Sequence, residues 1–177
     1  MNLKHSDWDE DLPPDGREEY DDLIKHLQRN QGFGLYFVQC KPLEEEKIIS
    51  AIIQDLPDKK IETLRLNEPI QGLYDQALNL YISQQVDILL IKGLEHSFHQ
   101  YEMINFGKIT KDKFTDLTKV PPILNHLNQQ RERFRDNIPI SIVFLMNQFS
   151  IDYFIRRAPD FSDWRSTLLK ISATCRV

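Results

Sequence analysis

The chain has 177 residues, of which 41% are hydrophobic and 28% are charged, and its formal net charge is −5 at pH 7. That length gives one domain with a sizeable core, and the composition indicates a globular cytoplasmic protein without an apolar membrane span or a basic leader. The acidic balance lies in residues 1–22, which hold nine acidic and two basic side chains. The remainder is close to neutral, so it has no general field for holding nucleic acid, and only a local basic patch could do so.

The chain begins with an acidic segment, residues 1–15, interrupted by Pro13-Pro14. This composition predicts a flexible arm, followed by a single α/β domain over residues 16–177. In that domain, apolar runs of strand length alternate with apolar stripes of helical spacing. We predict helices over 17–31, 42–56, 70–82, 121–136 and 150–157, and strands over 35–40, 61–66, 86–92, 140–146 and 168–174. A helical turn at 101–104 and an excursion from the core at 106–119 interrupt the alternation.

Alternating strands and helices favour right-handed crossovers and a sheet covered on both faces. We therefore predict a three-layer α/β/α fold with a mostly parallel, five-stranded sheet. The run 86–92 is continuously apolar, which is typical of a central strand, whereas 61–66 alternates and is expected nearer an edge. Two cysteines, Cys40 and Cys175, have no metal-ligand spacing and are predicted to be small core residues.

The sharpest functional question concerns the corner at Gly32–Ile53, where a buried strand is followed at once by a helix. In α/β folds that bind nucleotides, a glycine-rich loop at this corner cradles phosphates against the helix N-terminus. Here the glycines are missing, and Pro42 and then Glu44–Glu46 follow the strand. Those carboxylates take the favourable interaction with the helix dipole, about 0.3–1 kcal/mol per group, and would repel a triphosphate. Lys41 and Lys47 are interpreted either as vestiges of a phosphate-binding lysine or as solvated lysines that flank the helix start.

A second position of interest is Glu95, at the carboxyl end of the central strand, where Lys92 and Gly93 stand at positions that acids might occupy. Active P-loop enzymes carry an Asp-Glu pair at such a strand end, for Mg²⁺ coordination and water activation. Because Glu95 has no second acid beside it, we interpret it as a residue that caps the following turn or pairs with an arginine. Helical spacing would also let His96, His99 and Glu102 share a metal ion, but side chains beside a loop are more often solvated, and no metal site is predicted.

Basic and aromatic side chains gather in the last third of the chain. The candidates for binding a partner are Arg131, Arg135, Arg156, Arg157, Phe161, Trp164 and Arg165. Trp together with Arg is typical of interface anchors, and equally of a loop fixed onto a core. The arginines, with Arg133, would also suit phosphate or a nucleic-acid backbone. The near-neutral body favours salt bridges and a solvated helix face instead.

Four segments of the chain stand out together: Phe37–Cys40, Ile91–Glu95, Ile123–Arg133, and Ala158–Phe161 with Trp164–Ser166. Together they resemble the N-terminal NTPase-like domain of cyanobacterial AAA+/STAND-type proteins, a domain that often precedes tetratricopeptide repeats. The similarity spans nearly the whole chain after the acidic arm.

The resemblance implies an AAA+-like sheet with the first strand central, and a role in signalling or regulated assembly. Active members of the wider class use a P-loop lysine, an acidic strand end and a polar sensor residue on the fourth strand. The corresponding positions here are Lys41 or Lys47, Glu95 and Asn147. The lysines lack the glycine loop, so the resemblance is to a member with a degenerate Walker A motif.

Three hypotheses follow. The leading one is a catalytically inactive P-loop NTPase-like domain without a cofactor, which binds another protein or a second copy of itself. The first alternative is an ATPase of the same class that uses ATP and Mg²⁺ at an unconventional site formed by Lys41, Glu95 and Asn147. The second is a nucleic-acid-binding accessory protein that uses residues 108–119 and the arginine-rich helix.

Overall fold

The computed structural model describes residues 16–107 and 119–172. In chain order the elements are α1 (Gly16–Arg29), β1 (Gly34–Gln39), the short 3-10 helix η1 (Pro42–Glu44), α2 (Glu45–Asp55), β2 (Ile61–Arg65), α3 (Tyr74–Gln84), β3 (Ile88–Lys92), α4 (Glu95–Phe106), α5 (Pro122–Asn137), β4 (Ser141–Met146), α6 (Gln148–Arg157), α7 (Pro159–Ser162) and β5 (Thr167–Lys170). The predicted arm at 1–15, most of the predicted excursion at 106–119, and Cys175 lie outside the described residues.

The five strands form one sheet in the order β2-β3-β4-β1-β5, and every neighbouring pair is parallel. The predicted α/β fold is therefore confirmed, with β2 at an edge and β3 inside the sheet. The family resemblance implies a central first strand; β1 is an interior strand between β4 and β5, and the middle of the order is β4. Because all strands are parallel, their carboxyl ends meet at one edge of the sheet, where the chain turns into η1, α4 and α6.

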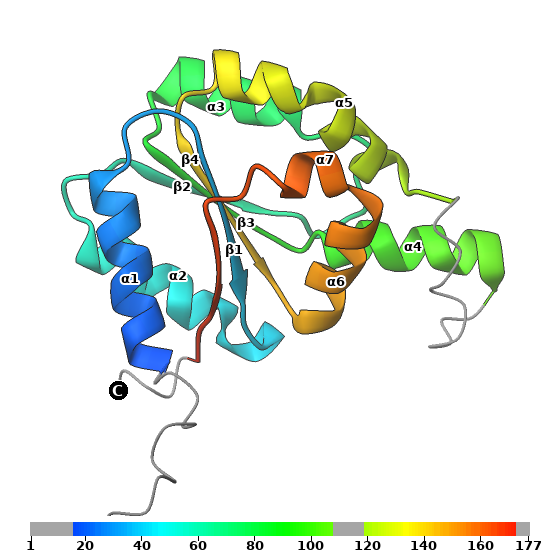
Figure 1. Ribbon diagram of the computed structural model, residues 1–177, viewed down its shortest axis with the longest axis horizontal. Helices are drawn as coiled ribbons and strands as arrows, with labels where there is room; N and C mark the ends of the chain where they lie inside the picture. The colour runs from blue at the N-terminus through cyan, green and yellow to red at the C-terminus, as the bar shows by residue number, and fades with distance from the viewer. Residues whose placement is uncertain (1–15, 108–118, 173–177) are drawn as a thin grey trace, which may run out of the picture.

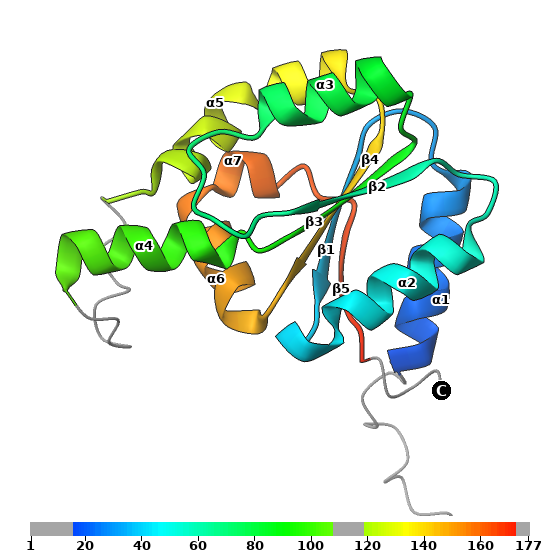
Figure 2. The same ribbon diagram turned by 180° about the vertical axis from the view of Figure 1, so that it is seen from behind.

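Helices cover both faces of the sheet (Figures 1 and 2), so the molecule has three layers. One face is covered by α1 and α2, and the other by α3, α5, α6 and α7 together with the first part of α4. In β1, Leu35 and Phe37 face the helix layer formed by α3, α5, α6 and α7, whereas Tyr36 and Val38 face α1 and α2. All four are buried, which is why the strand reads as a continuous apolar run rather than an alternation.

The helix predicted over 70–82 begins only at Tyr74. Side chains from later helices hold the segment before it in a non-helical conformation. The backbone N–H of Ile70 donates to Ser97 Oγ at 2.9 Å, and that of Tyr74 donates to His126 Nε2 at 3.1 Å. The ring of His126 also lies where a side chain at Gly72 would stand. These tertiary contacts override the helical spacing of the apolar residues.

Between β3 and α5 the chain forms a helix of 12 residues, α4, where only a turn at 101–104 is predicted. A polar residue on its buried face explains the error. Phe98 and Glu102 lie one turn apart, and both are buried. The Tyr153 hydroxyl donates a hydrogen bond to Glu102 Oε1, which satisfies the carboxylate inside the protein. A search for apolar residues at helical spacing does not detect a buried glutamate such as Glu102.

Pro159 ends α6, as the sequence predicts, but it also opens the one-turn helix α7. The last strand, β5, is shorter than predicted and covers Thr167–Lys170. Among the described residues, no helix has the length and apolar character needed to cross a membrane.

Candidate functional site

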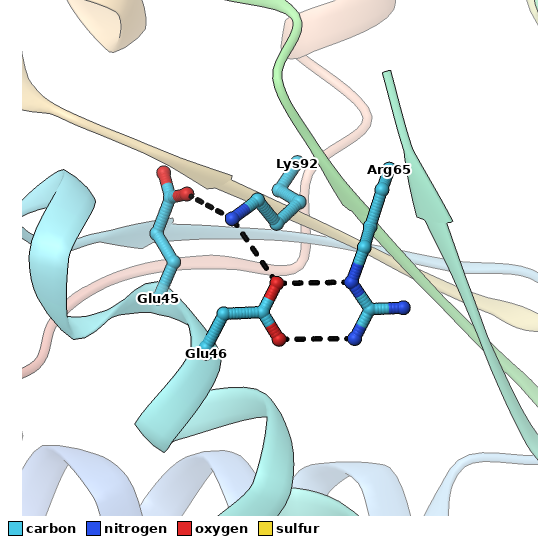
Figure 3. A network of polar contacts seen from close by, with 4 residues as sticks. All are labelled: Glu45, Glu46, Arg65 and Lys92. Carbon is cyan, nitrogen blue, oxygen red and sulfur yellow. Dashed lines mark hydrogen bonds and ion pairs between the residues drawn. The ribbon is translucent and has the colours of Figure 1, made fainter. Parts of the chain in front are cut away.

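The corner after β1 lies at the carboxyl edge of the sheet, beside the ends of β2 and β3. The chain leaves β1 through the buried Cys40 and enters α2 at Glu45. Because parallel strands end at the same edge, Arg65 at the end of β2 and Lys92 at the end of β3 face the start of this helix. Figure 3 shows the two cations directed at the carboxylates of Glu45 and Glu46.

These four side chains form one ion-pair network, which we call the corner clasp. Arg65 holds Glu46 in a bidentate contact, with both nitrogen–oxygen distances at 2.9 Å. Lys92 Nζ lies 3.1 Å from Glu45 Oε2 and 3.2 Å from Glu46 Oε1, so it bridges the two carboxylates. Both cations at the ends of these strands are thus paired with side chains of the same domain.

The two glutamates of the corner clasp differ in their electrostatics. Hydrogen bonds from Arg65 and Lys92 lower the pKa of Glu46 to about 2. The pKa of Glu45 is raised, because burial disfavours its charged form by more than the hydrogen bond from Lys92 favours it. Glu46 is thus a firmly ionised surface anchor, and Glu45 is a buried carboxylate that depends on Lys92.

The lysines proposed from the sequence as vestigial phosphate ligands are not part of this network. Lys41 and Lys47 are both exposed. The cations at the corner are Lys92 and Arg65, which sequence reasoning missed. One signal could have found them, because each is the last residue of a strand, and parallel strand ends meet beside the first helix.

The structure gives a steric reason for the absence of an acid at position 93, two residues before Glu95. Gly93 directly follows β3 with φ +90°, and a Cβ there would lie 2.2 Å from the Leu66 carbonyl oxygen. The Leu66 N–H also donates to the Lys92 carbonyl oxygen at 2.9 Å, so the segment after β2 crosses closely over the end of β3. An acidic side chain at position 93 has no room in this arrangement.

Glu95 itself opens α4 and lies close to the corner clasp. Its Oε2 atom is buried and has no hydrogen-bond partner among the described residues. Its charge contributes to the raised pKa of Cys40 and of Glu45. Burial, then Glu45, then Glu44 and then Glu95 raise the pKa of Cys40 to about 12, so this thiol stays protonated and is no nucleophile.

Asn147, the candidate sensor residue, caps α6. Its Oδ1 atom accepts a hydrogen bond from the Ser150 backbone N–H at 2.8 Å. A capping side chain of this kind satisfies one of the otherwise unpaired N–H groups of the first helical turn. The Asn147 side chain therefore already has a structural partner within the domain.

Two of the seven partner-binding candidates lie in the core. Phe161 has no exposed surface and packs in an aromatic cluster, with ring centroids 5.6 Å from Phe134 and 6.1 Å from Phe154. Arg157 is buried, and its guanidinium lies 3.8 Å from the centroid of the Tyr153 ring. Neither side chain is presented to a partner in this structure.

The other candidates lie on α5, on α6 and in the segment after α7. Arg156 is exposed, and Arg165 is half-buried and donates to the Ser162 carbonyl oxygen at 2.9 Å. Arg131 and Arg135 both lie over the ring of Trp164, at 6.0 and 5.1 Å from its centroid. The structure therefore brings three of the predicted residues together in one cluster.

The histidines considered as metal ligands do not assemble a site. His96 and His99 are exposed, and Glu102 is bonded to Tyr153 in the interior. Within residues 16–107 and 119–172, no group of three or more His, Cys, Asp or Glu side chains could hold a metal ion.

A hollow of about 580 Å³ lies at the opposite, amino edge of the sheet, and none of the predicted site residues lines it. Its polar lining includes Asn30, Lys59, Gln85, Asp87 and Ser141. Part of this lining is internally bonded, since Asn30 Nδ2 donates to Ser141 Oγ at 2.8 Å. Open parallel sheets bind their ligands at the carboxyl edge instead, which is the edge that the corner clasp occupies.

A scan of the chain against protein-family models gives no match, and a search of curated protein sequences gives no significant match.

Proposed function

We propose that the chain is a catalytically inactive, P-loop NTPase-like domain of the AAA+/STAND type, which acts as a protein-interaction module in signalling or regulated assembly. The observation that carries this proposal is the corner clasp. A nucleotide site at this corner would need free cations and free N–H groups at the helix start. Here Lys92 and Arg65 are neutralised by Glu45 and Glu46, which stand in the first turn of α2.

Two further features support the same reading. At position 93, two residues before Glu95, the Leu66 carbonyl oxygen leaves no room for an acidic side chain that would hold Mg²⁺. The interior position of β1, with a helix directly after it, supports the resemblance to the AAA+/STAND family. A domain that keeps such a scaffold without its phosphate chemistry acts through its surface, so its partner is another protein or a second copy of the chain.

The ATPase alternative needs Lys41, Glu95 and Asn147 to converge on one ligand. Lys41 is exposed and outside the corner clasp, and Asn147 is engaged as a helix cap. The nucleic-acid alternative needs an uninterrupted basic surface, and acidic residues interrupt the arginines of α5. Both alternatives therefore have less support than the interaction module.

Thermal denaturation with and without Mg-ATP tests the proposal. A ligand present at 100 times its Kd stabilises the folded state by about 2.7 kcal/mol, which raises the Tm of a domain of this size by roughly 5–10 °C. We expect no shift. A clear stabilisation that is lost in Glu95→Ala would contradict the proposal. Phosphate release that is lost in Lys41→Ala, but kept in the matched surface variant Lys47→Ala, would establish the ATPase alternative.

The role of the corner clasp can be tested separately with inorganic phosphate. The double variant Glu45→Gln/Glu46→Gln keeps the side-chain volumes and leaves Lys92 and Arg65 without carboxylate partners at the start of α2. We expect phosphate to stabilise this variant and to leave the natural chain unchanged. Equal responses of the two proteins would mean that the glutamates are not what excludes anions.

A further inference from the structure

A tryptophan that contacts two arginines forms a distinct surface cluster on the outer layer. Arg131 and Arg135 are one turn apart on α5, so they lie on the same side of that helix. Trp164 comes from the segment after α7, which packs against α5 (Figure 1). The guanidinium carbons lie 6.0 and 5.1 Å from the centroid of the indole ring. We call these three residues the Arg–Trp clamp.

The Arg–Trp clamp presents its donors to solvent. The side chain of Arg131 is 35% exposed and that of Arg135 is 53% exposed, while Trp164 is half-buried. Arginine side chains lose considerable rotamer freedom when they bind a partner. Contact with the half-buried Trp164 ring restricts these side chains before any partner arrives, and a guanidinium group can make planar, bidentate contacts with carboxylates.

The carboxylates that now accompany the two arginines are weak competitors. Asp136 is the immediate neighbour of Arg135 and accepts two hydrogen bonds from it, at 2.7 and 3.3 Å, and Asp160 lies 3.7 Å from Arg131. Both aspartates are about 60% exposed, a situation in which an ion pair contributes little. An incoming carboxylate can therefore replace or share them, and the exposed part of the indole offers an apolar contact beside it.

The distribution of charge around the clamp selects among anionic partners. Glu132 and Asp136 alternate with the arginines along α5, and Asp160 and Asp163 lie beside Trp164 in the sequence. Nucleic acid presents a continuous line of phosphates, which needs a continuous basic surface. A mixed surface repels such a line at several points. It suits a polypeptide segment that carries a few carboxylates, with apolar side chains between them.

We propose that the Arg–Trp clamp is a docking surface for an acidic segment of a partner protein. Carboxylates of that segment accept hydrogen bonds from Arg131 and Arg135, and an apolar side chain packs on Trp164. This inference rests on the proposed function, because it names the surface and the class of partner of the interaction module.

Fluorescence polarisation with a labelled synthetic peptide of aspartate, glutamate and leucine tests the proposal, and a single-stranded DNA of equal net charge serves as the competing probe. We expect the full chain to bind the peptide and to bind it more tightly than the DNA. Trp164→Leu and Arg135→Gln should each weaken peptide binding by about tenfold or more, as at an interface anchor.

The matched control is Arg133→Gln. Arg133 lies on the same helix and is also exposed, but its guanidinium stacks on Tyr74, at 4.2 Å, rather than on Trp164. Loss of this charge should change peptide binding by less than about twofold. Denaturation midpoints of all variants establish that they fold.

Three results would overturn the inference: no peptide binding at low salt, equal losses in Arg133→Gln and Arg135→Gln, or tighter binding to the DNA. The Mg-ATP experiment tests for nucleotide binding at the corner clasp, and the residues of the Arg–Trp clamp take no part in it. ATP binding combined with an intact peptide response would remove the inactive-domain proposal and leave the clamp standing. Failure of the peptide alone would remove only the clamp.

Discussion

The substitution Glu46→Gln tests whether the corner clasp stabilises the fold. It removes a carboxylate that accepts two hydrogen bonds from Arg65 and one from Lys92, while Lys92 keeps its contact with Glu45. The side chains of Glu46 and Arg65 are 51% and 46% exposed, so solvent screens much of their attraction. Exposed pairs contribute about 0.2–1 kcal/mol, and the bidentate geometry with a second cation favours the upper end. We expect Glu46→Gln to lower the free energy of unfolding by about 1 kcal/mol at pH 7.

The pH dependence of that difference has a definite sign. The pKa of Glu46 is about 2 in the folded protein, compared with an ordinary value of 4.5. A carboxylate whose pKa is lowered by folding contributes stability that is fully present above its unfolded pKa. This contribution is lost as the pH falls from 4.5 toward 2. The natural chain and the variant should therefore converge in stability over this range.

Urea denaturation at pH 7, 4.5 and 3 measures the difference directly. The control is Glu62→Gln, which neutralises a carboxylate on the same strand as Arg65 that has no ion pair or hydrogen bond with the described residues. At high salt the difference between Glu46→Gln and the natural chain should also shrink. A gap of unchanged size from pH 7 to pH 3, or equal pH profiles for the two variants, would refute the argument.

Three further predictions concern the same scaffold. Glu45→Gln should show the opposite pH trend in urea denaturation: burial raises the pKa of Glu45 in the folded state, so the natural chain should gain stability relative to this variant as the pH falls toward 4.5. Phe161→Ala should destabilise the protein by about 3–5 kcal/mol, because Phe161 is fully buried; a loss below about 1 kcal/mol would mean that it is not a core residue. Gly93→Ala should lower the thermal midpoint far more than Gly32→Ala, since both glycines have a positive φ but only Gly93 faces a backbone oxygen.

The buried strands could be predicted from the sequence because a parallel sheet covered on both faces needs apolar residues at successive positions. The runs that became β1, β3 and β4 have this property, and their burial is nearly complete. Helix ends were less predictable. The start of α3 depends on hydrogen bonds that the backbone N–H groups of Ile70 and Tyr74 donate to Ser97 and His126, and such long-range contacts leave no local pattern in the sequence.

The candidate site was predicted in part. The absence of a phosphate loop and the role of the glutamates at the helix start could be argued from the residues after β1 alone. The cations that pair with them could not, because Arg65 and Lys92 lie far away in sequence and meet Glu46 only through the strand order. The burial of Phe161 was not predicted for a related reason. A turn-rich segment has no periodicity that distinguishes a core aromatic residue from a surface one.

Inserting a glycine-rich loop after β1 would not by itself create a nucleotide site in this chain. Lys92 and Arg65 would still be held by Glu45 and Glu46, and phosphate would have to displace both carboxylates from the helix start. Position 93 would still be closed to an acid, because Gly93 lies against the backbone of Leu66. Lys92, Arg65 and Asn147 at this edge therefore already have structural partners. The corner clasp joins α2 to the ends of β2 and β3, so opening it for a ligand would also loosen the packing of the first helix layer against the sheet.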